Sequence, residues 1–303
     1  MSDRNLSSQP LHAMSIDVED YFHVAALAGV IPRESWDSQP SRVQANTERL
    51  LALFDRHDVK ATFFVLGWVA EQHPDLVRMI DRAGHEIASH GYSHQLIYRQ
   101  TPEVFRKETR HSKALLEDLT GKPVHGYRAA SYSITRDSLW ALDILAECGF
   151  RWDSSIFPVH HDNYGIPGTP CSPYTLKTDS GAILQEFPLT TARVFGFPVP
   201  AAGGGYFRQF PYPVFRYLFS RASGFGARPQ IFYLHPWEVD PGQPRFHNAS
   251  WLSRFRHYTN LDKCEHRLER LLQDFRFGTV SESFAAWQPD RPMISTRQML
   301  ATA

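Results

Sequence analysis

Short apolar runs alternate along the chain with longer segments whose apolar residues recur at helical spacing. Residues 12–18 (HAMSIDV), 60–67 (KATFFVLG) and 85–90 (HEIASH) have the length and composition of strands. Residues 42–59 and 73–84 carry apolar residues three and four positions apart, and the second segment has a proline near its start and a glycine at its end. Both segments are therefore predicted to be helices.

The same alternation continues through most of the 303 residues. Further strands are expected at 124–130, 150–155, 182–190, 230–239 and near 277–284, and further helices at 101–121, 136–149 and 261–275. About seven or eight such units predict an α/β fold whose parallel strands close into a barrel. An open doubly wound sheet is the alternative.

One domain accounts for residues 12–285, with residues 1–11 as an N-terminal tail and residues 286–303 as a C-terminal tail. Within it, residues 155–229 are rich in proline, glycine and aromatic residues and break the alternation. Loops of that length in a compact domain usually build a binding surface.

Composition narrows the class of protein. Hydrophobic residues make up 42% and charged residues 21%, which is typical of a soluble globular chain. Lys+Arg and Asp+Glu both total 32, so no net charge would attract nucleic acid or an anionic membrane. No apolar run approaches the roughly 20 residues of a membrane span. The three scattered cysteines and the absence of a visible signal peptide lead us to expect a cytoplasmic protein without disulfides.

Ionisable residues stand at the ends of the predicted strands, where the reactive groups of parallel α/β barrels lie. An apolar strand that ends in an ionisable residue is costly unless that residue finds a partner or a function. The residues concerned are Asp17, Glu19 and Asp20, then His90 and His94, Arg128, Asp153 and His235.

The stretch EIASHGYSH places His90 and His94 four positions apart. The pair is either a chance pair in a chain with 15 histidines or a pair of ligands to one metal ion, since two imidazoles and a carboxylate are a common Zn²⁺ set. The carboxylate is open. Glu19 shares a face with Asp17 if the first strand continues through residue 19, whereas Asp20 turns inward if the chain bends after residue 18.

The remaining residues each have a structural and a functional interpretation. Arg128 is either part of an ordinary ion pair or a bidentate clamp that orients a carboxylate and keeps it ionised. His235 is either a hydrogen-bonded core histidine or a proton donor. Together the set describes a hydrolase of an amide or ester, in which a metal activates water, a carboxylate accepts its proton and an imidazole protonates the leaving group.

These residues lie in motifs that resemble the polysaccharide deacetylases with a NodB-homology domain, carbohydrate esterase family four. The resemblance runs from about residue 12 to residue 285, and within the family it is similar to the branch associated with exosortase-linked exopolysaccharide loci. The motifs appear in the family's order: SIDVED, SHGYSH preceded by KATFFVLG, YRAASYS, WDSSIFP and YLHPWE.

The resemblance implies a distorted (β/α) barrel of seven or eight units and metal-dependent removal of acetyl groups from N-acetylated glycans. It also implies a role for each matched position. Asp17 would be the general base and Arg128 its clamp, His90 and His94 metal ligands with Glu19 or Asp20, His235 the general acid tuned by Asp153, and the Tyr132 backbone N–H an oxyanion donor. The metal would be Zn²⁺ by default, with Co²⁺ or Ni²⁺ suited to the same ligands.

Two other functions are compatible with the sequence. One is a related hydrolase of a small amide, such as a deformylase or an allantoinase-like enzyme, although the long aromatic region 155–229 favours a larger substrate. The other is a glycan-binding relative without catalysis. The polysaccharide concerned and the oligomeric state have no signature in the sequence.

Overall fold

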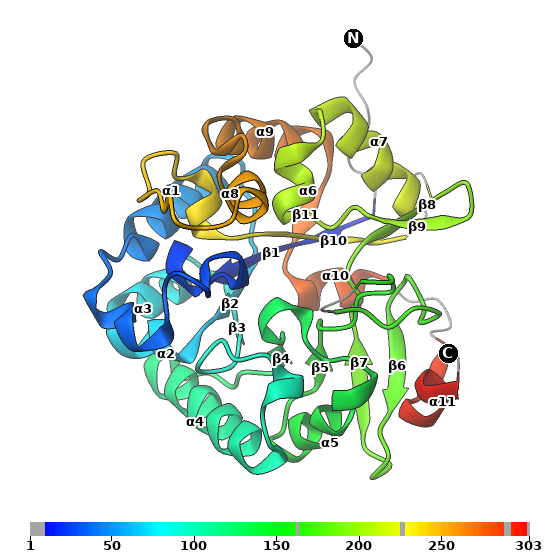
Figure 1. The fold of residues 1–303 in the computed structure, drawn as a ribbon. Helices are drawn as coiled ribbons and strands as arrows, with labels where there is room; N and C mark the ends of the chain where they lie inside the picture. The colour runs from blue at the N-terminus through cyan, green and yellow to red at the C-terminus, as the bar shows by residue number, and fades with distance from the viewer. Residues whose placement is uncertain (1–9, 162–163, 225–227, 288–291, 302–303) are drawn as a thin grey trace.

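The protein consists of a mostly parallel sheet surrounded by helices (Figure 1). The computed structural model describes residues 10–161, 164–224, 228–287 and 292–301. The strands pair in the order β10-β1-β2-β3-β4-β5-β7-β6-β12, and β11 pairs with β1. Their bounds are β1 His12–Val18, β2 Thr62–Val65, β3 Glu86–Ser89, β4 Gly126–Tyr127, β5 Trp152–Asp153, β6 Tyr174–Lys177, β7 Ile183–Glu186, β10 Ile231–Leu234, β11 Phe277–Gly278 and β12 Met293–Ser295.

Helices follow most of these strands and lie outside them in Figure 1. The α-helices are α1 Val43–Arg56, α2 Gly67–Gln72, α3 Pro74–Arg82, α4 Pro102–Thr120, α5 Trp140–Glu147, α6 Gly204–Gln209, α7 Tyr212–Ala222, α8 Trp251–Tyr258, α9 Leu261–Asp274, α10 Val280–Ala286 and α11 Thr296–Ala301. Short 3-10 helices, among them η2 Tyr21–His23, η3 Ala25–Leu27, η4 Arg33–Ser38, η6 Ala130–Tyr132 and η8 Pro236–Val239, lie in the connections.

The sequence prediction of a parallel α/β fold is confirmed. The regular strand ladder runs from β10 to β12, and the other edge of β10 pairs with the chain after β9 through a parallel bridge between Gly203 and Tyr233. At the far side β7 pairs in parallel with β5 and antiparallel with β6.

Residues 155–229 contain more regular structure than the sequence suggested. Besides β6 and β7 they form the two-stranded hairpin of β8 (Thr191–Val194) and β9 (Phe197–Pro200), and the helices α6 and α7. Some of the prolines that broke the apolar pattern lie at element ends, as Pro211 does before α7, whereas Pro198 lies within β9.

The chain beyond β10 also differs in part from expectation. The last strand, expected near 277–284, ends after Gly278, because Thr279 and Glu282 form a capping box that starts α10. Residues 293–301, assigned from sequence to a C-terminal tail, form β12 and α11, and β12 extends the sheet beside β6. Residues 1–9 of the expected N-terminal tail lie outside the described residues.

The local sequence explains why the predicted elements form. All seven residues of β1 are buried, since both faces of this central strand are covered. Helix α4 begins where the Thr101 hydroxyl accepts a hydrogen bond from the Val104 N–H, and it ends at Gly121, whose φ of 67° is a left-handed conformation that glycine adopts readily. Across the described residues, none of the helices has the length and apolar character needed to cross a membrane.

Candidate metal centre and active site

The ionisable residues expected at the strand ends converge on one edge of the sheet. Asp17 lies within β1 and Glu19 directly after it, His90 follows β3, Arg128 follows β4, and His235 follows β10. Since β10, β1, β2, β3 and β4 are consecutive parallel neighbours, their carboxyl ends meet at the same edge. The sheet therefore brings together residues as far apart in the chain as 17 and 235.

Glu19, His90 and His94 form the one group among the described residues in which three potential ligand side chains converge. Their ligand atoms all lie within 4.8 Å of one another, and Glu19 Oε2 is 2.6 Å from His94 Nε2. Glu19 Oε2 is buried and makes no hydrogen bond of regular geometry, although it lies close to His94 Nε2. A buried carboxylate oxygen that faces two imidazoles in this way fits a ligand of a bound cation better than a structural acid.

His90 has the state that a metal ligand needs. Its Nδ1 donates a hydrogen bond to the Arg128 carbonyl oxygen at 2.9 Å, which leaves the lone pair of Nε2 available. Burial lowers the pKa of His90 to about 4, so its ring is neutral at physiological pH. Burial alone would raise the pKa of Glu19, but the neighbouring His94, His235 and His90 lower it overall. The group thus offers a neutral imidazole at His90 and an ionised oxygen at Glu19.

Asp20, the other carboxylate that the sequence left open, is directed away from this group. Its carboxylate accepts hydrogen bonds from the Ser41 hydroxyl and from the backbone N–H groups of Tyr21, Arg42 and Val43. It therefore joins the start of η2 to the start of α1. The chain does bend after Val18, but the bend directs Glu19 rather than Asp20 toward the histidines.

The backbone around the histidines is unusual. His94, Ser131 and Tyr132 have φ values of 52°, 51° and 55°, in the left-handed region that few non-glycine residues occupy. Such conformations persist only where the surrounding structure holds them, and they are common at functional sites. Here they orient two loops toward the same space.

Asp17 and Arg128 form a buried ion pair beside the metal group. Arg128 is fully buried, and its Nη1 donates to Asp17 Oδ1 at 2.6 Å and to the Ser15 hydroxyl at 2.9 Å. Its Nη2 donates to the Ser154 hydroxyl at 3.0 Å, and its guanidinium lies 3.9 Å from the centre of the Phe64 ring. The arginine is therefore held from several sides, and it fixes the orientation of the Asp17 carboxylate.

Tyr132 contributes differently from the oxyanion role that the resemblance implied. Its backbone N–H donates to the Ala129 carbonyl oxygen at 3.0 Å, as part of the 3-10 turn η6, and is already engaged. Its hydroxyl instead lies 3.4 Å from Asp17 Oδ2. Tyr132 therefore meets the site through its side chain.

His235 lies opposite His94, on the other side of Glu19. Its Nε2 is 3.3 Å from Glu19 Oε1 and 4.0 Å from Asp17 Oδ2. Its Nδ1 donates to Glu238 Oε1 at 2.7 Å, and the buried Arg208 donates from Nε to the other oxygen of Glu238 at 2.5 Å. A chain of charges, Arg208 to Glu238 to His235, thus ends at the site.

The charges in this chain affect the protonation of the imidazole. Burial alone would lower the pKa of His235, but the carboxylates of Glu19, Glu238 and Asp17 raise it to about 9. Burial alone would raise the pKa of Glu238, but Arg208 and His235 lower it to about 2. His235 is consequently a protonated donor at neutral pH, although a cation bound beside Glu19 would oppose this rise.

Asp153, which the resemblance made the partner of His235, has other neighbours. It accepts hydrogen bonds from the N–H and hydroxyl of Ser155 at 3.1 and 2.7 Å, and it lies beside Glu186. Burial raises the pKa of Asp153 to about 6, and burial together with Asp153 raises the pKa of Glu186. Glu238 occupies the role expected for Asp153.

Glu238 and Arg208 were not identified from the sequence. A signal for Glu238 was present, because Pro236 favours a turn after His235 and residue i+3 of such a turn returns to its first residue. Arg208 had no local signal. Its helix α6 reaches the site because Gly203, with φ of 133°, lies so close to β10 that a Cβ atom would come within 2.0 Å of the Tyr233 carbonyl oxygen.

Two adjoining cavities open onto the site. One, of about 220 Å³, is lined by Asp17, Glu19, both metal-group histidines and His235, and the other, of about 320 Å³, extends past His94 toward η4. Both have Ala25, His94 and Ser131 in their walls. Among the aromatic residues in and next to the region 155–229, Tyr164 and Trp237 line the first cavity. Trp152, Phe157 and Phe207 are buried in the core.

Comparison with known families divides the chain into two matched regions. Residues 35–152 match the family described as polysaccharide deacetylase, and residues 154–285 match a domain of unknown function, DUF3473. The chain therefore contains a polysaccharide deacetylase domain. The metal-group histidines and Arg128 lie in the first matched region, whereas His235, Glu238 and Arg208 lie in the second.

Named relatives agree with this assignment. A peptidoglycan deacetylase of Helicobacter pylori is 28% identical over 164 residues, 52% of each chain. The peptidoglycan-N-acetylglucosamine deacetylase PgdA of Listeria monocytogenes is 40% identical over 88 residues, 29% of this chain and 18% of that protein. The matches thus span about half of these relatives or less.

A solved structure shares the fold. The putative polysaccharide deacetylase from Mycobacterium smegmatis aligns over 94% of this chain and 96% of that one, with a TM-score of 0.58 and 20% sequence identity. The likeness covers the region matched to DUF3473 as well as the deacetylase region.

Proposed function

We propose that the protein is a metal-dependent hydrolase that removes N-acetyl groups from the amino sugars of a bacterial polysaccharide or its precursor. The observation that carries this proposal is the convergence of Glu19, His90 and His94 within 4.8 Å, flanked by a clamped carboxylate on one side and a protonated imidazole on the other.

Glu19, His90 and His94 would hold the cation, with Zn²⁺ as the default and Co²⁺ or Ni²⁺ as alternatives for the same ligands. A divalent cation in such a site lowers the pKa of bound water and polarises a carbonyl oxygen. The chemistry of the acetamido group requires both effects, because an amide is a poor electrophile and its amine a poor leaving group.

The protein's own residues would carry the proton transfers. Asp17 would accept a proton from the attacking water, since Arg128 orients its carboxylate. His235 would donate a proton to the departing amine, with Glu238 fixing the ring through Nδ1 so that Nε2 faces the site. Base and acid are thus separate residues on opposite sides of the ligand group.

The two adjoining cavities favour a substrate longer than a single sugar. A small amide would need only the 220 Å³ cavity beside the ligand group, whereas a glycan chain could also occupy the space toward η4. Tyr164 and Trp237 offer aromatic faces on which sugar rings pack. This observation favours an oligomeric glycan, and we place the substrate in an exopolysaccharide on the resemblance of the motifs.

Acetate release from a panel of N-acetylated monomers and oligomers tests the proposal. We expect release from oligomers, loss of release after treatment with a chelator, and recovery when Zn²⁺, Co²⁺ or Ni²⁺ is returned. A metal-loaded protein that releases no acetate from any member of the panel would contradict it. Faster turnover of small amides than of oligomers would favour the deformylase or allantoinase-like alternative.

A further inference from the structure

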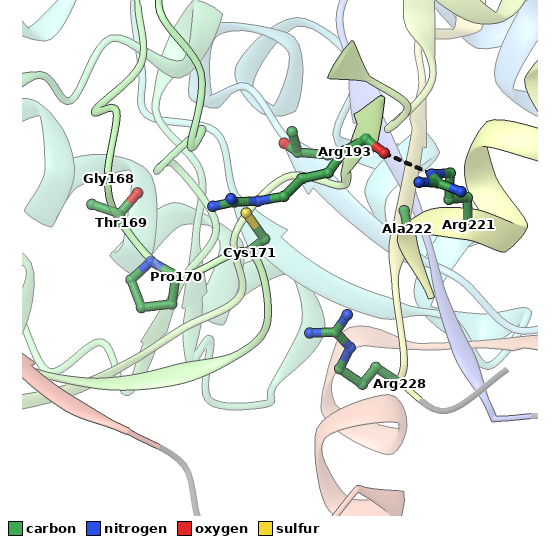
Figure 2. A pocket seen from close by; sticks show the side chains of 9 residues that line it. Gly168, Thr169, Pro170, Cys171, Arg193, Arg221, Ala222 and Arg228 are labelled. Carbon is green, nitrogen blue, oxygen red and sulfur yellow. Dashed lines mark hydrogen bonds between the residues drawn. The ribbon is translucent and has the colours of Figure 1, made fainter. Parts of the chain in front are cut away.

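A third cavity, of about 580 Å³, lies away from the active site and is lined by three arginines (Figure 2). Arg193 comes from β8, Arg221 from the end of α7, and Arg228 from the segment before β10. In Figure 2 the side chain of Arg193 extends past Cys171, and Arg228 lies below Cys171 in the same view. Among the described residues that line this cavity, none is acidic.

Arg221 is held in place by its neighbours. Its Nε donates to the Arg193 carbonyl oxygen at 2.6 Å, and its Nη1 lies 3.4 Å from the Tyr217 hydroxyl one turn earlier in α7. A chain with no net charge thus concentrates three positive charges at one cavity. The three positive charges repel one another in the unbound protein, and an anionic ligand would relieve this repulsion.

The hairpin β8–β9 next to this cavity ends in exposed aromatic residues. Val194 pairs with Phe197, so Phe195 and Gly196 form a two-residue turn, and both have positive φ, 50° and 85°. Such turns favour asparagine, aspartate or glycine at the first position, yet Phe195 stands there with 94% of its surface exposed, and Phe197 is 73% exposed. Neither turn geometry nor core packing explains these two side chains.

The hairpin and α7 form one surface with the arginines. Ala192 and Ala201 of the hairpin pack against Leu218 and Ala222 of α7, which fixes the hairpin on the helix. Arg193 is two residues from Phe195, a distance of about 7 Å along an extended strand. The exposed Phe195 and Phe197 thus lie at the tip of the hairpin whose first strand carries Arg193, and Tyr217, next to Arg221 on α7, is exposed as well.

We propose that this hairpin–α7 surface, made by Phe195, Phe197 and the cavity of Arg193, Arg221 and Arg228, binds the surface of an anionic lipid membrane. The two phenylalanines insert at the boundary of headgroups and acyl chains, and the arginines bind lipid phosphates. Aromatic side chains next to clustered arginines are the combination that interfacial binding requires, since each contribution alone gives weak and reversible attachment. An anionic glycan would use the same arginines, and the experiment below distinguishes it from a membrane.

Co-sedimentation of the whole protein with lipid vesicles tests this proposal independently of enzyme activity. We expect binding to vesicles of equal parts phosphatidylcholine and phosphatidylglycerol, little binding to pure phosphatidylcholine, and weaker binding as salt is raised. The double substitution Arg193→Gln/Arg228→Gln should lower the partition coefficient about tenfold or more, given the contribution of each arginine near an anionic surface. Phe195→Ser/Phe197→Ser should lower it comparably.

Matched controls separate this surface from general effects. Arg82→Gln/Arg151→Gln removes two exposed arginines elsewhere, and Phe255→Ser removes a half-exposed phenylalanine of α8; both should leave the partition coefficient unchanged. Equal losses in the controls would overturn the proposal, as would no binding to the anionic vesicles. Binding of the wild-type protein to a soluble polyuronate, lost in the arginine variant without any vesicle binding, would assign the cavity to an anionic glycan and also overturn it.

Discussion

The two sides of the active site each contain a buried arginine, and they use it differently. On the base side, Arg128 contacts the Asp17 carboxylate directly at 2.6 Å. On the acid side, Arg208 contacts Glu238 at 2.5 Å, and Glu238 in turn contacts His235 at 2.7 Å. An arginine next to a base keeps that base ionised, whereas an arginine next to the acid would repel its proton. The intervening Glu238 lets Arg208 position His235 while presenting a negative charge to it.

The largest effect on stability is expected from breaking the base-side pair. Arg128→Met should lower the free energy of unfolding by about 3–5 kcal/mol, because it leaves the Asp17 carboxylate buried without its counter-charge. Urea denaturation followed by circular dichroism measures this loss. The double variant Arg128→Met/Asp17→Asn should recover part of it. If the single variant is as stable as the wild type, the pair is not a buried charge pair.

On the acid side, removal of the imidazole should cost more than removal of its partner. His235→Ala should lower kcat about 10²–10⁴-fold, the range of general acid catalysis, provided that the protein deacetylates glycans as proposed. Glu238→Gln should lower kcat about 10–100-fold and shift the pH profile to lower pH, because the ring loses a negative neighbour.

Steady-state rates on an N-acetylated oligomer, compared across pH, distinguish these outcomes. The matched control is Glu103→Gln, which changes an exposed acid at the start of α4, away from both cavities, and should leave the profile unshifted. A Glu238→Gln protein with a wild-type profile would show that the carboxylate does not act on His235.

The buried carboxyl pair behind the site should make stability depend on pH. Because burial raises the pKa of Asp153 from 3.8 to about 6, the folded state binds more protons than the unfolded state between these values. Stability should therefore be highest below about pH 4 for this group and fall as pH rises through 6, by up to about 3 kcal/mol. Asp153→Asn should flatten this dependence in denaturation measured from pH 4 to 8, whereas an unchanged slope would contradict the shift.

A smaller effect is expected at Asp20. Asp20→Ala should lower the free energy of unfolding by about 1–3 kcal/mol, since it leaves the backbone N–H groups of Tyr21, Arg42 and Val43 without their acceptor. It should leave metal affinity unchanged, as measured by calorimetric titration with Zn²⁺. A large loss of affinity with retained stability would return Asp20 to the list of ligands.

Sequence patterns predicted the base side of the site more fully than the acid side. Asp17 lies near the end of β1, and His90 and Arg128 directly follow β3 and β4, so strand order alone places them at one edge of the sheet. Glu238 and Arg208 depend on a 3-10 turn and on the packing of α6 against β10, which are set by tertiary contacts that no local pattern records. Asp153 was misassigned for the same reason, because its strand ends beside β7 and directs the carboxylate toward Glu186.

The choice between Glu19 and Asp20 shows the same limit on a smaller scale. Alternation along β1 favoured Glu19 through continuation of the strand, yet the strand ends at Val18. Glu19 reaches the histidines because the chain turns there, and the backbone N–H groups at the start of α1 hold Asp20 on the opposite side. The alternation of side chains along β1 thus favoured Glu19, which the structure places at the histidines. The premise of that prediction, that the strand continues through residue 19, is wrong.

The metal content of the purified protein tests the central claim most directly. After loading with Zn²⁺ and removal of free metal, elemental analysis should find one equivalent in the wild type and in Asp20→Ala, and a small fraction of that in Glu19→Ala and His90→Ala. Thermal unfolding of each variant confirms that the protein is folded. One equivalent of metal in folded Glu19→Ala and His90→Ala proteins would contradict the account, because the cation would then be held elsewhere.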